Sequence, residues 1–158
     1  MPFFSRRHRP EPEPLDDAAW LWNGYQRFDQ QQGRYNGPPE RLAEGGDNEL
    51  ANGNLAAALF MYARAIDRMQ TQYGMLGTRQ FGRNDLMIFD TYRTLLQDVL
   101  LNHPNAPVAS TDINQNAKRT IGMMRGVAMA AERAGVDPGP YYQRINEVCA
   151  LAAIEQWW

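Results

Sequence analysis

Cysteine, histidine and serine are scarce in this chain, and each scarcity excludes a class of site. The single cysteine, Cys149, excludes an internal disulfide framework and a cysteine-rich metal centre. The two histidines, His8 and His103, have no second His, Cys or carboxylate at metal-ligand spacing, so we expect no metal. Neither Ser5 nor Ser110 lies in a Gly-x-Ser-x-Gly turn, and no Gly-rich phosphate loop occurs. We therefore expect no catalytic residue, no cofactor and no enzymatic activity.

The sequence also lacks a large excess of one charge and long apolar runs. The net charge of −2, from 16 basic and 18 acidic residues, predicts no nucleic-acid partner. No apolar run approaches the roughly 18 to 20 residues that span a bilayer, so we expect no stable membrane insertion. The N-terminal MPFFSRRHRP resembles the start of an export signal, but PEPEP follows in place of its apolar stretch. A cytoplasmic location is therefore expected.

The chain divides into a short tail and one domain. Alternating Pro and Glu favours an extended polyproline conformation, so we expect residues 1–14 to form a disordered tail. The remaining residues, 15–158, have the length of one domain. The basic cluster of the tail is also a candidate hook for an acidic partner or a membrane surface.

Apolar residues at helical spacing and weak strand signals predict an all-α fold with about six helices. The first helix begins with Asp16 or Asp17 as its cap, and Trp20, Tyr25 and Phe28 are expected on its buried side. The predicted helices span residues 16–32, 39–52, 54–73, 83–103, 112–135 and 138–158. Asn84 or Asp85 is expected to cap the start of the fourth helix, and His103 to cap helix carbonyls at its end as a cation. Asp112 and Gln115 are expected to cap the start of the fifth helix, which ends at Gly135. These helices form either a compact bundle or a short stack of antiparallel hairpins.

The stretch GNLAAALFMYARAI, residues 53–66, is apolar on nearly every side of a helix. Polar groups near it are confined to a narrow strip of Arg64, Asp67 and Arg68. A helix of this kind must be covered on two sides, so we expect it to be an inner helix.

The same stretch resembles the second half of a tetratricopeptide repeat. The resemblance rests on a turn and a spacing, Gly53-Asn54-Leu55 followed by Ala58, Tyr62 and Ala65. The 34-residue frame puts Leu42 and Gly46 on the first helix and covers about residues 40–67. Gly45 and Glu49 depart from the family pattern, which has Leu and an aromatic residue there, and no second copy follows 34 residues later.

The resemblance implies a partner groove lined by the first helix of the hairpin. In this frame the residues exposed to the groove are Glu40, Ala43, Asp47 and Leu50. The two carboxylates would repel an acidic group, so a basic or neutral partner segment is expected.

Trp157 and Trp158 are further candidates for partner binding, because aromatic side chains bury a large area at low entropy cost. The alternative is that they fold back onto the bundle. We expect a non-enzymatic protein–protein interaction module that holds a protein or peptide. Two alternatives stay open: a small-ligand carrier or helical enzyme with a pocket lined by Tyr, Trp and Arg, and a self-assembling homo-oligomeric subunit.

Overall fold

The computed structural model describes residues 16–76, 80–105 and 113–152. Within these ranges the chain forms six α-helices and no strand, which confirms the all-α prediction. The helices are α2 (Asp17–Gln32), α3 (Pro39–Ala51), α4 (Leu55–Thr71), α5 (Arg83–Asn102), α6 (Ile113–Arg133) and α7 (Gly139–Leu151), with a 3₁₀ turn, η1 (Gly33–Tyr35), after α2 and a π-helical turn, η2 (Gln72–Leu76), after α4.

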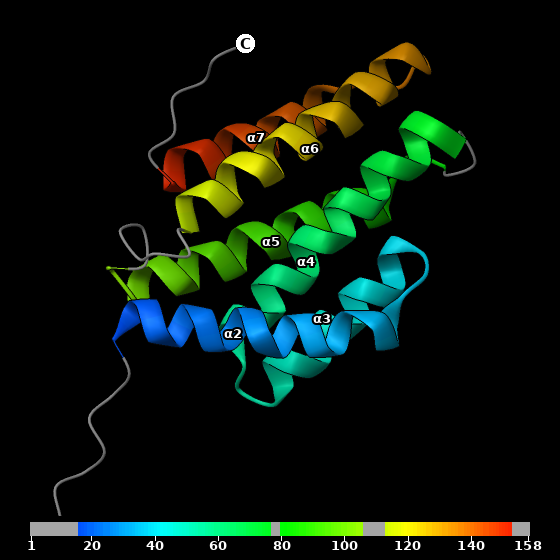
Figure 1. The fold of residues 1–158 in the computed structure, drawn as a ribbon. Coiled ribbons are helices and arrows are strands. Elements are labelled where there is room, and N and C mark those ends of the chain that lie inside the picture. The colour runs from blue at the N-terminus through cyan, green and yellow to red at the C-terminus, as the bar shows by residue number, and fades with distance from the viewer. Residues whose placement is uncertain (1–15, 77–79, 106–112, 153–158) are drawn as a thin grey trace, which may run out of the picture.

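The helices form a bundle of three layers with two helices in each (Figure 1). The outer layers are α6 with α7 and α2 with α3, and α4 with α5 lies between them. Helix α4 packs against α5 and α6, and α7 packs against the same two, so these four helices close a ring. Helices α5 and α6 lie diagonally across this ring and have few backbone contacts with each other. Among all pairs of helices, α3 and α4 pack most extensively.

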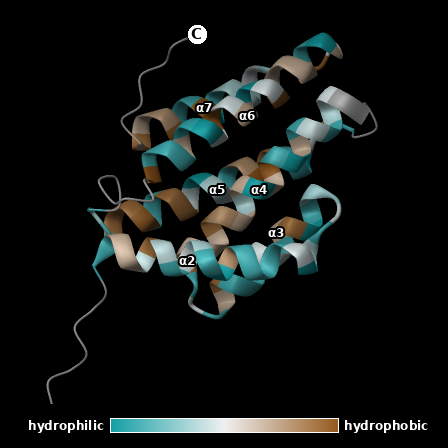
Figure 2. Ribbon diagram, viewed as in Figure 1, coloured by the Kyte–Doolittle hydropathy of each residue, from teal (hydrophilic) through white to brown (hydrophobic). Residues whose placement is uncertain are grey.

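Helix α4 is the inner helix that its sequence predicts. It contacts α2, α3, α5 and α6, and its buried residues lie on every side except the strip that carries Arg64, Asp67 and Arg68. Five alanines of α4, together with Leu59, Met61, Ile66 and Met69, are almost fully buried. Figure 2 shows brown, hydrophobic segments along α5 and largely teal, hydrophilic ribbon along α2, as expected for an inner and an outer helix.

Two of the predicted helix ends are confirmed and one predicted cap is wrong. The Asp16 side chain accepts a hydrogen bond of 2.7 Å from the backbone N–H of Ala19. Gly135 ends α6 with a φ of +77°. Helix α5 begins at Arg83 with Gly82 as its cap, so neither Asn84 nor Asp85 is the cap. Asp85 is instead buried, and its carboxylate accepts hydrogen bonds from the Tyr73 and Tyr141 hydroxyls.

His103 joins two helices and does not cap helix carbonyls with its ring. The imidazole stacks on Trp20 with ring centroids 3.4 Å apart, and its Nδ1 lies 2.9 Å from Oδ1 of Asp17. The second oxygen of Asp17 accepts a hydrogen bond of 2.7 Å from the backbone N–H of Asn105. The start of α2 is thereby fixed to the end of α5, because one carboxylate serves both contacts.

We expect Asp17→Ala to lower the free energy of unfolding by about 1–2 kcal/mol, because it removes both contacts of a largely buried carboxylate. Chemical denaturation of the variant measures the loss. Asp29→Ala is the control, since Asp29 is exposed and bonds only Gln32 of its own helix. Equal losses in the two variants would show that the contact between α2 and α5 contributes nothing.

Several predictions fall on residues outside the described ranges. These are the tail, residues 1–14, the cap residue Asp112, and the tryptophans Trp157 and Trp158. Among the described helices, none combines the length and the hydropathy needed to cross a membrane.

Candidate functional site: an aromatic groove between three helices

A groove with a volume of about 620 Å³ lies between α2, α4 and α6. We call it the aromatic groove. Its lining residues are Trp22, Tyr25, Phe28, Gln32, Phe60, Ala63, Arg64, Asp67, Gln115, Asn116, Arg119, Thr120 and Met123. Helices α2 and α6 both pack on α4 without closing over it, which leaves the groove open to solvent.

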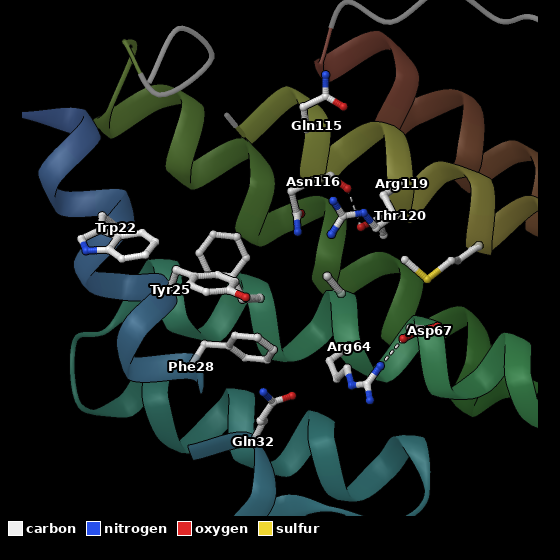
Figure 3. Close-up of a pocket in the computed structure, with 13 residues that line it drawn as sticks. Trp22, Tyr25, Phe28, Gln32, Arg64, Asp67, Gln115, Asn116, Arg119 and Thr120 are labelled. Atoms are coloured by element: carbon white, nitrogen blue, oxygen red, sulfur yellow. Dashed lines mark hydrogen bonds and ion pairs between the residues drawn. The ribbon is translucent and has the colours of Figure 1, made fainter. Parts of the chain in front are cut away.

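One wall of the groove is a cluster of aromatic rings. Trp22, Tyr25 and Phe28 are three residues apart and therefore share one face of α2. The ring of Tyr25 stacks against Trp22 at 5.8 Å between centroids and meets Phe60 of α4 edge-on at 5.6 Å. Phe28 and Phe60 are buried, whereas Trp22 and Tyr25 keep 47% and 41% of their surface exposed. The wall is thus anchored in the core and presents two large rings to a ligand (Figure 3).

Gly24 allows α2 to approach α4 closely enough to form this wall. A Cβ atom added to Gly24 would overlap the side chain of Ala56 and would lie 3.3 Å from the backbone N of Ala57. Only a glycine fits at this crossing. The aromatic rings that flank it in sequence reach Phe60 because the helix backbones are this close.

The opposite wall, from α6, is polar. Asn116 and Arg119 project from α6 toward the aromatic rings of α2 (Figure 3). The Arg119 side chain is exposed and has no ion-pair partner among the described residues. Arg64 and Asp67, which stand at one end of the groove, form an ion pair with each other on α4. The groove therefore combines an apolar wall with a polar wall that carries an available cation.

Three of the predicted partner residues line another, smaller groove. Glu40, Ala43 and Asp47 lie together between α3, α4 and α5 around a volume of about 290 Å³, which we call the acidic groove. Its far wall includes Met87, which is 58% exposed. Leu50 does not line this groove, although it is 43% exposed. Three of the four predicted residues are thus brought together, and Leu50 is not.

A buried tyrosine, Tyr62, contacts the acidic side chain of Asp47 in this groove. The Tyr62 hydroxyl donates a hydrogen bond of 2.6 Å to Asp47. Burial and this carboxylate raise the pKa of Tyr62 well above its ordinary value, so its hydroxyl stays protonated and holds Asp47 in place. The ring of Tyr62 in turn packs where Gly46 has no side chain. Larger residues would therefore not fit at position 46.

Contacts with other parts of the chain explain the two departures from the repeat pattern. A Cβ atom at Gly45 would lie 2.7 Å from the ring of Tyr35, which occupies the place of a side chain there. Glu49 is only 4% exposed and accepts two hydrogen bonds from Arg27 of α2, at 3.0 and 3.1 Å, and one of 2.9 Å from Asn54. Burial by itself would raise the pKa of Glu49, but these three bonds lower it below its ordinary value.

The sequence prediction did not find the aromatic groove. It expected Trp20, Tyr25 and Phe28 on the buried side of the first helix, whereas the fully buried residue is Leu21 and Tyr25 is half exposed. The available signal was the three-residue spacing of Trp22, Tyr25 and Phe28, which marks one helix face. That spacing does not say whether a neighbouring helix covers the face.

Comparison of the chain with protein-family models, with curated proteins and with solved structures found no match. Within the described residues no cluster of three or more His, Cys, Asp or Glu side chains is placed to hold a metal ion. Any functional assignment therefore rests on the grooves themselves.

Proposed function

We propose that this protein is a non-enzymatic interaction module that holds a segment of a partner protein in its aromatic groove. The observation that carries this proposal is the pair of half-exposed rings, Trp22 and Tyr25, in an open groove. Aromatic rings of this kind are the residues that dominate binding energy at protein interfaces, because they lose little conformational entropy when covered. A cytoplasmic location is part of the proposal.

The acidic groove supports the same class of function. It lies along α3 of the hairpin that resembles a tetratricopeptide repeat, where that family binds its partners. Glu40, Glu44 and Asp47 give it a negative lining beside the exposed Met87. The occupant of this groove is accordingly a basic or neutral segment with an apolar side chain.

Capture of a partner from an extract of the native host tests the proposal. We expect the full chain to retain a partner that the Trp22→Ala, Tyr25→Ala double variant loses by at least about tenfold, as befits two central aromatic anchors. The control is Leu101→Ala with Met129→Ala, which removes two exposed apolar side chains that line neither the aromatic nor the acidic groove. Equal capture by all three proteins would overturn the proposal, provided that circular dichroism shows the same helix content.

A small-ligand carrier is the second candidate. Its supporting observation is the volume of about 620 Å³, which falls among the pockets that bind small molecules, together with lining by Trp22, Tyr25, Arg64 and Arg119. Mass spectrometry of the native protein distinguishes the two, since a carrier purified from its host retains a bound small molecule. Light scattering at several concentrations tests the third candidate, self-assembly, which predicts a mass that rises with concentration.

A further inference from the structure

The polar wall of the aromatic groove includes hydrogen-bond donors from Asn116 and Arg119. The amide of Asn116 carries one carbonyl oxygen and an N–H₂ group with two donors, and its oxygen already accepts one hydrogen bond. The hydroxyl of Tyr92, a residue with no exposed surface, donates a hydrogen bond of 2.9 Å to Oδ1 of Asn116. The Nδ2 group of Asn116 is therefore left on the groove side, where Figure 3 shows it beside the Arg119 guanidinium.

The buried tyrosine fixes this orientation. Burial raises the pKa of Tyr92 well above its ordinary value, so the phenol stays protonated and acts as a donor to Asn116. The hydroxyl of Thr120 is also engaged, since it donates 2.8 Å to the backbone carbonyl of Asn116. Asn116 thus presents the N–H₂ donors of its amide to the groove.

The charge of the groove favours an anion. Its ionised lining groups are Arg64, Asp67 and Arg119, and Asp67 is paired with Arg64. Arg119 therefore contributes a positive charge that no described carboxylate neutralises. Asn116 and Arg119 are three residues apart on α6 and therefore share one helix face. A guanidinium and an amide N–H₂ on one face suit a carboxylate, which accepts charge-assisted hydrogen bonds at both of its oxygens.

We propose that the aromatic groove recognises an acidic, aromatic segment: a large apolar side chain packs on Trp22 and Tyr25, and a neighbouring carboxylate binds Arg119 and Asn116. This inference rests on the proposed function and names the chemistry of the partner. Tyr92 is a positioning residue, because it acts only through Asn116. The acidic groove on α3 selects the opposite charge, so the two grooves accept different segments.

Titration of the full chain with two small probes, followed by amide NMR shifts, tests the inference. The probes are N-acetyltryptophan, which has a carboxylate, and N-acetyltryptophanamide, which has the same ring without the charge. We expect the acid to bind about three- to tenfold more tightly, because the donors lie in a partly exposed groove. This preference should shrink as salt is added.

Four variants assign the preference to the proposed groups. Arg119→Gln should bind both probes equally, and Asn116→Asp should bind the acid more weakly than the amide. Tyr92→Phe should reduce the preference, whereas Tyr62→Phe, which removes a buried hydroxyl beside the acidic groove, should leave it unchanged. Asn116→Asp retains the acceptor for Tyr92, so it stays a valid test even if Tyr92→Phe fails to fold.

Three results would overturn the inference. They are equal affinity of the two probes for the unmodified protein, a preference that survives in Arg119→Gln, and no shift with either probe. The proposed function is judged separately by partner capture. If both probes bind equally to the unmodified protein and neither binds the Trp22→Ala, Tyr25→Ala variant, the proposed carboxylate site is refuted. The apolar groove is then still supported as a binding site. If the protein prefers the acid probe but captures no partner from the extract, the carboxylate site is supported and the proposed interaction function is refuted.

Discussion

Gly24→Ala is expected to lower the free energy of unfolding by about 1–3 kcal/mol, although alanine is the better helix former. The added methyl group would occupy the space of the Ala56 side chain at the closest crossing of α2 and α4. The two helices must separate to admit it, because the neighbouring atoms are backbone and a buried methyl group. Denaturant titration measures the loss.

The same substitution should also weaken binding in the aromatic groove. Tyr25 and Phe28 reach Phe60 only because α2 lies this close to α4. Moving α2 outward separates these rings, so the affinity for N-acetyltryptophanamide should fall along with the stability.

Gly122→Ala is the matched control for Gly24→Ala. Gly122 also lies inside a helix, α6, but a Cβ atom there would meet nothing within 4 Å. Helix propensity alone then applies, and the variant should gain about 0.5–1 kcal/mol. A gain in both variants would show that α2 and α4 tolerate a wider crossing, and would contradict the role assigned to Gly24.

Arg27→Met should destabilise the protein strongly at neutral pH and much less in acid. In the unmodified protein the pKa of Glu49 is lowered, so its contribution to stability is complete above its ordinary value of 4.5 and is lost as the pH falls through the lower, folded value. Without Arg27 only the Asn54 amide remains, and burial then raises the pKa of Glu49. The variant therefore carries an unfavourable buried charge at pH 7, which protonation removes below that raised pKa.

The measurement is the difference in melting temperature between the two proteins from pH 7 to pH 4. We expect it to be largest at pH 7 and to narrow as the pH falls toward 4, as a carboxyl pKa raised by burial requires. Arg41→Met is the control, because Arg41 pairs with the exposed Glu44 at 3.5 Å, and its loss should be small at every pH. A pH-independent difference for Arg27→Met would show that Glu49 is not held by Arg27.

The sequence by itself determined the helices and the place of the inner helix. The apolar pattern of residues 53–66 requires cover on two sides whatever the neighbours are, and α4 has that cover. Caps are local as well, so Asp16 and Gly135 were found from a few adjacent residues. Such features follow from the sequence because their partners lie within one or two helical turns.

Only the tertiary structure decided which faces stay open. The ring of α4, α5, α7 and α6, with α2 and α3 on its outside, leaves the aromatic groove uncovered, and no spacing within α2 specifies that. In the sequence Glu49 is only a departure from the repeat pattern. The structure explains it, because Glu49 pairs with Arg27, which lies 22 positions earlier. Likewise, the orientation of the Asn116 amide depends on Tyr92, which is 24 positions away. Contacts at such separations depend on how whole helices pack, because side chains from distant helices must meet in space.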